Sequence, residues 1–371
     1  MKEAVIVGAG IVGLVAAREM SQRGIEVEVY DQKRHIEDNA DKASGILSRD
    51  GLARTGIRYE KSKVNTLRGA ILHAGREELK IKAREDKAFV LDRKELARAC
   101  YEDAKDAGAK ITLGRRLDRK DLKELGDGGR VIVGADGAVS SVASAFGFPK
   151  INEYALTYKK TYSGAEVADK SVVELFFYNR RNRFFGWSAP YSGSVVELGV
   201  GVSSRARNSS SKAFADFIKL NGIKSIIEGA KPETGYASMI PLETRKVTAR
   251  GNVLLVGDAA GQVKATTGGG IIFGSLCAKA AAESVERHFR LGTPLEAYEK
   301  IWRKRYGTEL KMHRMLHEYY SSIGSRSFEA FFRIARMLGA EAFFGKYGDM
   351  DRPSLMIKRF FLRSLADGRK E

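Results

Sequence analysis

The stretch VIVGAGIVG, residues 5–13, decides the fold of this 371-residue chain. An apolar run over residues 3–7 predicts a buried strand, and the apolar periodicity after the glycines predicts a helix that ends near Gln22. A second run, residues 25–30, predicts another strand and leads into Asp31. Together these segments predict a β-α-β unit of about 30 residues, which is the unit that binds dinucleotides.

Each glycine of this stretch has a physical role in such a unit. Gly8 allows the tight turn, Gly10 lets the backbone approach a pyrophosphate, and Gly13 lets the helix pack closely on the strand. The helix N-terminus offers N–H groups and the positive end of its dipole to the phosphates. Asp31 lies 18 residues after Gly13, in register to bind the ribose hydroxyls. We therefore expect a dinucleotide site here.

Two later segments place an acid at the end of an apolar strand. One is LLVGDAA, residues 254–260, with Gly257 and Asp258; the other is GADG, residues 134–137. Asp258 is placed to bond the ribityl chain of a flavin. The order of the three motifs along the chain therefore favours FAD over NAD.

Three consecutive glycines, Gly268, Gly269 and Gly270, precede Ile271 at the start of another predicted helix. Consecutive glycines leave several backbone N–H groups able to face one acceptor. The acceptor expected here is the pyrimidine edge of the flavin, which becomes anionic on reduction, and its stabilisation is an electrostatic task. Close helix packing explains one glycine but not three in a row.

With these motifs in place, the sequence resembles the geranylgeranyl reductase family of flavoproteins, within the larger hydroxylase-like FAD group. The resemblance covers roughly residues 1–290. It rests on four ordered motifs: GAGIVG (8–13), LDR (91–93), GADG (134–137) and VGDAAGQVKATTGGGI (256–271).

This resemblance implies FAD as the cofactor and assigns roles to further residues. Arg93 would contact the FAD phosphates, Ser44 and Gly45 would line the flavin face, and Asp258 would hold the ribityl chain. The family's Y-x-W-x-F-P signature corresponds to FGWSAP, residues 185–190.

Within that signature Trp187 and Pro190 match the family, whereas Phe185 replaces Tyr and Ala189 replaces Phe. The last change is expected to widen the pocket or alter its depth. Trp187 and Pro190, with Ser44 and Gly45, are the residues expected to face the reacting double bond. A core position for the indole of Trp187 is the alternative.

The order of the predicted elements indicates an α/β fold, α+β overall, with three parts. These are a Rossmann-like FAD-binding domain (residues 1–65, 88–150 and 248–295), an inserted, mainly antiparallel substrate domain (66–87 and 151–247) and a helical C-terminal region (296–371).

The formal charge of +18 comes from 64 Lys and Arg against 46 Asp and Glu. Such a charge suits an anionic membrane surface or an acidic electron donor such as a ferredoxin. Nucleic acid is not expected, because no nucleic-acid-binding module is evident. In the C-terminal region Phe328, Phe331 and Phe332 lie near several arginines. This stripe either contacts an anionic membrane or packs on the rest of the protein.

Cys100 and Cys277 are far apart and flanked by helix-forming residues, so we expect small core side chains and neither a disulfide nor a metal site. The sequence starts directly with a strand pattern and contains no apolar run long enough to cross a bilayer. A cytoplasmic protein is therefore expected, with peripheral contact at the inner face of the cell membrane.

By this resemblance the chain is expected to be an FAD-dependent reductase that saturates double bonds of geranylgeranyl chains, those of archaeal-type lipids in particular. A prenyl chain offers no polar group, so an apolar aromatic cavity is what its binding needs. Two alternatives remain: a flavin monooxygenase of the same fold, and a flavin electron carrier without an organic substrate of its own.

Overall fold

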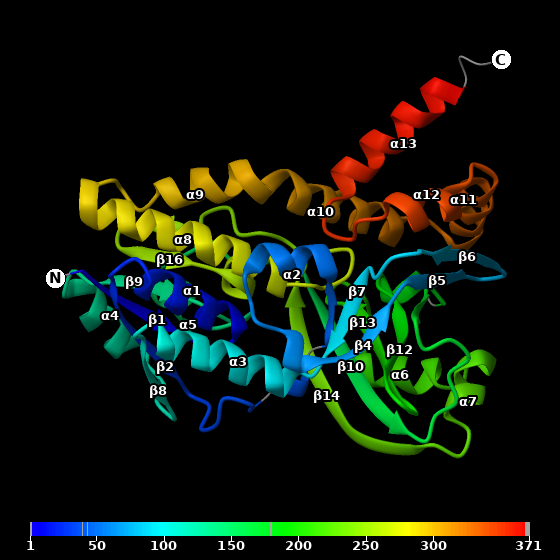
Figure 1. The fold of residues 1–371 in the computed structure, drawn as a ribbon, viewed down its shortest axis with the longest axis horizontal. Helices are drawn as coiled ribbons and strands as arrows, with labels where there is room; N and C mark the ends of the chain where they lie inside the picture. The colour runs from blue at the N-terminus through cyan, green and yellow to red at the C-terminus, as the bar shows by residue number, and fades with distance from the viewer. Residues whose placement is uncertain (1, 39, 43, 179, 368–371) are drawn as a thin grey trace.

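The opening β-α-β unit forms as predicted and lies at the centre of a six-stranded sheet (Figure 1). The computed structural model describes residues 2–38, 40–42, 44–178 and 180–367, without the side chains of residues 41, 180 and 361–367. Strand β1 (Glu3–Val7) pairs in parallel with β2 (Glu26–Asp31) and β9 (Val131–Gly134), and helix α1 (Ile11–Ser21) connects β1 to β2.

The strand order of this sheet is β15-β16-β9-β1-β2-β8. Strands β8 (Lys110–Leu113) and β16 (Val253–Leu255) are parallel to their inner neighbours, and the short β15 (Ala249–Arg250) is antiparallel. The carboxyl ends of β1, β9 and β16 therefore meet at one edge of the sheet, where ligands of doubly wound folds bind.

Side chains of β1 alternate between two cores on opposite faces of this sheet. Ala4 and Ile6 belong to the larger core, which helices α1, α3 (Arg93–Asp106) and α8 (Ile271–Leu291) cover. Val5 and Val7 belong to the smaller core, under α4 (Arg119–Asp127) and α5 (Ser141–Ala145). The sheet is therefore buried on both faces, as an apolar parallel strand requires.

The second sheet has seven strands in the order β14-β10-β13-β12-β11-β5-β6, and all neighbours are antiparallel except β5 and β11. Helices α6 (Ser210–Phe217) and α7 (Asn221–Ile227) cover one of its faces. Its strands are β5 (Gly69–Ala74), β6 (Glu77–Lys82), β10 (Tyr154–Ser163), β11 (Val172–Phe176), β12 (Gly186–Ser192), β13 (Val195–Ser203) and β14 (Lys231–Pro241).

A third, three-stranded sheet joins the two parts. It contains β3 (Ile46–Ser48), β7 (Ala88–Leu91) and β4 (Lys63–Leu67), and helix α2 (Arg49–Thr55) follows β3. Strand β4 spans the predicted domain boundary at residues 65 and 66. Short 3-10 turns complete the described elements: η1 (Ala40–Lys42), η2 (Glu60–Ser62), η3 (Arg180–Asn182) and η4 (Gly257–Ala260).

The C-terminal helices run along α8 and then over β5 and β6, and α13 projects from the body (Figure 1). Phe328 and Phe332 pack on Ala74 and Leu79, whereas Phe331 is exposed. Most of the aromatic stripe therefore packs on the protein. The elements are α9 (Ala297–Trp302), a π-helical turn (Arg303–Gly307), α10 (Thr308–Ser322), α11 (Ser325–Met337), α12 (Ala340–Tyr347) and α13 (Pro353–Asp367).

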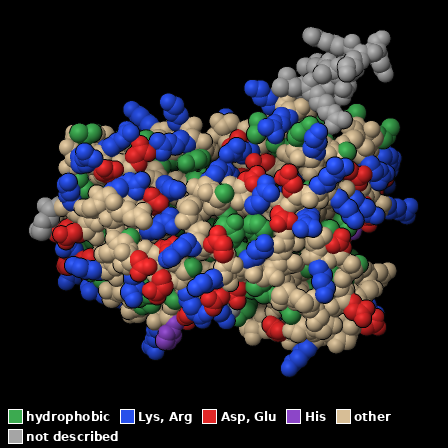
Figure 2. Space-filling model, in the orientation of Figure 1, with side chains coloured by type: hydrophobic (Ala, Val, Ile, Leu, Met, Phe, Trp, Pro, Cys, Tyr) green, Lys and Arg blue, Asp and Glu red, His purple; other side chains and the backbone are tan. Residues whose placement is uncertain are grey.

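Figure 2 shows Lys and Arg side chains spread over the visible face and interspersed with Asp and Glu, rather than gathered in one patch. Cys100 and Cys277 are buried, as expected for core side chains, and burial raises the pKa of Cys100 to about 12. Within the described ranges, no helix is both long enough and apolar enough to span a bilayer.

A network of buried hydrogen bonds connects α9 to the end of β16, and we expect it to stabilise the fold. Gln262 donates to the Tyr298 hydroxyl at 2.8 Å, and this hydroxyl donates to the Leu255 carbonyl at 3.0 Å. Tyr298→Phe leaves both partners buried without this contact, so we expect unfolding free energy to fall by about 1–3 kcal/mol in urea denaturation. The exposed Tyr319→Phe is the control, and an equal loss in both variants would contradict the role of the network.

Candidate functional site

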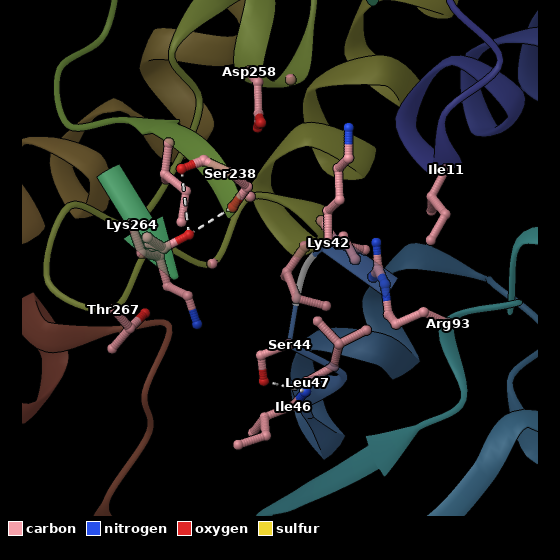
Figure 3. A pocket seen from close by; sticks show the side chains of 18 of the residues that line it. Ile11, Lys42, Ser44, Ile46, Leu47, Arg93, Ser238, Asp258, Lys264 and Thr267 are labelled. Carbon is pink, nitrogen blue, oxygen red and sulfur yellow. Dashed lines mark hydrogen bonds between the residues drawn. The ribbon is translucent and has the colours of Figure 1, made fainter. Parts of the chain in front are cut away.

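Two cavities, of about 540 and 780 Å³, open at the carboxyl ends of β1, β9 and β16. The two cavities adjoin, because the same six residues line both, and together they are called the channel. These shared residues are Gly10, Ile11, Ala40, Arg93, Ala135 and Gly137. Figure 3 shows side chains of the smaller cavity, with Lys264 and Thr267 at the left, Ile11 and Arg93 at the right, Asp258 at the top and Ser44 below it.

The three early glycines differ in what surrounds them. Gly8 has a φ of +108°, and a Cβ there would overlap the Ala135 carbonyl. A Cβ on Gly13 would overlap the Gly8 carbonyl, whereas a Cβ on Gly10 would meet nothing within 4 Å. Gly8 and Gly13 are therefore required by the fold itself. Gly10 opens onto both cavities, where a pyrophosphate would approach the backbone.

Asp31 lines the larger cavity at the end of β2. Its carboxylate accepts hydrogen bonds from the backbone N–H groups of Ala9, at 2.6 Å, and Lys33, at 2.9 Å. The Lys33 ammonium donates to the Ala9 carbonyl at 2.7 Å, and burial lowers its pKa although Asp31 opposes the shift. Asp31 thus braces the glycine turn and also faces the space where the sequence predicts a ribose.

Arg93 and Asp258 lie on either side of the smaller cavity. Arg93 opens helix α3, whose N-cap Asp92 accepts from two backbone N–H groups. Burial raises the pKa of Asp258 to about 6, and the positive charge of Arg93 opposes this rise. A carboxyl group in this state is well suited to hydrogen-bond a hydroxyl of a ligand.

The predicted flavin-face pair, Ser44 and Gly45, separates in the structure. Ser44 lines the smaller cavity. Gly45 is buried behind it: its carbonyl accepts from the Leu91 N–H at 3.0 Å, and a Cβ there would overlap the Leu91 carbonyl. Gly45 thus serves the packing of the start of β3 on β7, and its place at the flavin face stays a prediction.

Each glycine of the late block has its own neighbour. Gly268 has a φ of +76°, a Cβ on Gly269 would lie 2.7 Å from Lys264 Cε, and a Cβ on Gly270 would lie 2.7 Å from Asp258 Oδ1. The three glycines and Ile271 all line the cavity. The N–H of Gly268 donates to the Lys264 carbonyl at 2.8 Å. Of the backbone N–H groups that the sequence predicts as donors to the flavin, those after Gly268 therefore remain.

The far wall of the smaller cavity comes from the seven-stranded sheet. Trp187 lines it, and a Cβ on Gly199 would overlap the indole, so the ring lies flat over the neighbouring strand β13. Gly201 gives the same room to the ring of Phe184. These two glycines alternate with buried valines in LGVGV, residues 198–202. This pattern is the signal that sequence reasoning overlooked.

Pro190 and Ala189 do not line this cavity. The Pro190 carbonyl accepts from the Asn65 amide at 3.0 Å, and Ala189 is buried in a cluster with Leu67, Val90 and Val173. The expectations that Pro190 faces the double bond and that Ala189 widens the pocket or changes its depth therefore stay predictions. A larger residue at position 189 would overpack the cluster instead.

Sequence reasoning also missed the polar groups on the far wall. Lys159 donates to Glu197 at 2.6 Å, and both side chains are buried. The Thr157 and Ser238 hydroxyls lie 2.6 Å apart and line the same cavity (Figure 3). Across the described part of the chain, no three His, Cys, Asp or Glu side chains gather in a way that could hold a metal ion.

Comparison with known proteins identifies relatives along the whole chain. A family model described as FAD binding domain matches residues 1–274. An uncharacterized protein of Methanocaldococcus jannaschii is 28% identical over 383 residues, covering 99% of this chain and 96% of that protein. A digeranylgeranylglycerophospholipid reductase of Methanothrix thermoacetophila is 28% identical over 359 residues, covering 86% of this chain and 87% of the reductase.

Solved structures confirm the predicted fold. A geranylgeranyl bacteriochlorophyll reductase-like protein of Thermoplasma acidophilum has a TM-score of 0.80 at 16% identity, with 96% of this chain and 94% of that chain covered. A flavin-dependent brominase has a TM-score of 0.73 at 14% identity, with 99% of each chain covered. The family match and the relatives also confirm FAD as the cofactor, and the channel from Asp31 past Gly10 to the late glycine block fits that group.

The different surroundings of Gly10 and Gly13 predict different defects. Gly10→Arg should give folded but colourless protein, because its Cβ would meet nothing within 4 Å and the rest of the side chain would fill the pyrophosphate space. Gly13→Ala should also lower the stability of FAD-free protein, by about 1–3 kcal/mol, because its Cβ overlaps backbone. Flavin absorbance and urea unfolding measure the two effects. Equal stability of the two variants without FAD would contradict this distinction.

Proposed function

The chain belongs to the FAD-binding domain family, and we propose that it is a reductase that saturates the double bonds of geranylgeranyl chains in archaeal-type membrane lipids. That it is an FAD-dependent oxidoreductase follows from the family. The substrate is the proposed part, supported by relatives named as digeranylgeranylglycerophospholipid reductases at 28% identity and below.

One observation carries the proposal: the motifs that hold FAD and an apolar aromatic wall line the same cavity. An isoprenoid chain has no polar group to bond, so a cavity can orient it only by shape and apolar contact. The wall opposite the dinucleotide motifs supplies such contact. Its apolar side chains include Val173, Leu175, Phe184, Phe185, Trp187 and Ile240.

When bound and reduced, FAD supplies a hydride for one carbon of a double bond. The residues of this chain would orient the double bond, keep water away from it and hold a proton for the other carbon. The Trp187 ring and its neighbours would perform the first two tasks. Among the described residues of the far wall, Lys159, Thr157 and Ser238 carry exchangeable protons close to the cavity.

A flavin monooxygenase or halogenase is the second candidate, favoured by the full-length similarity to a flavin-dependent brominase. Such enzymes use the same fold with oxygen as a substrate. An electron carrier without an organic substrate is the third, and the excess of positive charge would suit an acidic donor such as a ferredoxin. Anaerobic turnover distinguishes these candidates from a reductase.

Dithionite-reduced enzyme, incubated without oxygen with geranylgeranyl lipids, should add two hydrogen atoms to each double bond, as read by mass spectrometry. Trp187→Ala should lower turnover on the order of 100-fold while FAD stays bound, because a misplaced chain reacts slowly. Trp187→Phe keeps an apolar ring and is the matched control, with a smaller loss. If no saturated product forms from phospholipid, diphosphate or quinone-type prenyl substrates, the reductase proposal fails and the oxygen-dependent or the electron-carrier function replaces it.

A lipid substrate also calls for contact with a membrane surface, and we propose that α11 supplies it. Its outer face carries large exposed apolar side chains, with Ile334 56%, Met337 80% and Leu338 64% exposed. Phe331 lies on the same helix, with its ring centroid 6.3 Å from that of Tyr319 in α10. Basic residues flank this face, which suits the interface of an anionic membrane.

Vesicles with anionic lipid should bind the protein, and binding should weaken with salt because charges are screened over about 10 Å at 0.1 M. Met337→Glu should weaken binding further by removing apolar contact. Leu291→Glu, at the last residue of α8, whose side chain is 75% exposed, is the matched control, because α8 lies away from α11 (Figure 1). Equal binding of the two variants would exclude α11 as the contact.

A further inference from the structure

A buried carboxylate ties the C-terminal region to the late glycine block. Asp351, between α12 and α13, is 0% exposed. Its Oδ1 accepts from Lys264 Nζ at 2.7 Å, and its Oδ2 accepts from Arg54 Nη2 at 3.2 Å and from the Ser48 hydroxyl. Burial acts to raise the pKa of Asp351, but Lys264, Ser48 and Arg54 outweigh it and lower this pKa. The carboxylate is therefore ionised.

Lys264 lies between this carboxylate and the cavity. Its side chain is buried and lines the cavity. Its backbone N–H donates to the Gly269 carbonyl at 3.1 Å, and a Cβ on Gly269 would lie 2.7 Å from its Cε and 3.3 Å from its Nζ. The ammonium group is therefore held against the backbone that leads into helix α8.

Two cations share the Asp351 carboxylate, so the cluster Lys264–Asp351–Arg54 carries one excess positive charge. Arg54 is partly exposed, with 27% of its side chain open to water, whereas Lys264 is buried on the cavity side. The nearby His313 responds to this field: burial lowers its pKa to about 3, and Lys264 contributes to the decrease. A buried excess charge is costly unless a partner of opposite sign lies next to it.

We propose that Lys264 contacts the pyrimidine edge of FAD and stabilises the negative charge which that edge carries in the reduced cofactor, and that Asp351 is the positioning residue that holds Lys264 there. The reduced, anionic ring, beside the first turn of α8, is thus the partner of Lys264 on the cavity side, whereas water screens the charge of the partly exposed Arg54. The C-terminal region becomes a component of the flavin site. This inference rests on FAD binding alone and stands apart from the choice of substrate.

The cluster provides its own matched control. Lys264 and Arg54 both pair with Asp351, but only Lys264 lines the cavity. If the cluster only fastened the C-terminal region to the body, losing either cation would have the same consequence. If Lys264 acts on the cofactor, only its loss should change the reduction potential of FAD.

The test is a spectroelectrochemical titration of the FAD-loaded protein without any lipid. In Lys264→Met, reduced FAD should lose about tenfold in affinity relative to oxidised FAD, which lowers the potential of the two-electron couple by about 30 mV. The spectrum of the reduced cofactor should also shift from the anionic towards the neutral form. Lys264→Arg should recover most of the shift, and Arg54→Met should leave the potential close to that of the wild type.

Asp351→Asn gives an independent reading with the opposite sign. Its amide oxygen can still accept from Lys264 and hold the ammonium group in place, but the negative charge beside Lys264 is lost, so the potential should rise. An unchanged potential in Lys264→Met, or equal shifts in Lys264→Met and Arg54→Met, would overturn the proposal. If Lys264→Met does not retain FAD, the Asp351→Asn titration decides: a rise supports the proposal, and no change or a fall overturns it. Failure of lipid saturation affects none of these outcomes.

Discussion

The structure depends on one close contact between two pieces of backbone. Helix α1 can start directly above β1 only because Gly13 brings its Cα against the Gly8 carbonyl, while Gly8 lies against the Ala135 carbonyl at the end of β9. A methyl group at either position would separate the helix from the sheet. This contact sets the N-terminus of α1 at the channel, between β1 and β9, and so sets where a pyrophosphate can bind.

The glycines of the late block have a different role, because they make room for polar side chains. Gly269 leaves space for Lys264 and Gly270 leaves space for Asp258, so a cation and a carboxyl group flank the start of α8. The helix N-terminus adds its own N–H groups to this arrangement. The block therefore places a cation and the N–H groups of a helix N-terminus at one place, which suits a cofactor that becomes anionic on reduction.

Sequence reasoning succeeded where an element and its function lie close together in the chain. The strand–glycine–helix unit, Asp258 and the predicted α/β fold are readable because periodicity and glycine spacing are local signals. It failed where the contact is remote: Asp351 lies 303 residues from its partner Ser48 and 87 from Lys264. It also gave Gly45 and Pro190 roles at the cavity, whereas in the structure the Gly45 carbonyl accepts from the Leu91 N–H and the Pro190 carbonyl accepts from the Asn65 amide.

The far wall shows how an apolar surface can be kept rigid. An apolar ligand, such as the proposed prenyl chain, cannot orient an aromatic ring through directional bonds, so the protein must hold the ring itself. Trp187 rests on Gly199, and its indole N–H donates to Glu197 at 2.9 Å. Glu197 in turn accepts from Lys159, so two donors offset the cost of burying its charge. The polar pair therefore fixes the ring from one edge, and the face that the ring presents to the cavity stays apolar. Polar groups next to an apolar cavity are in this case a support for its shape.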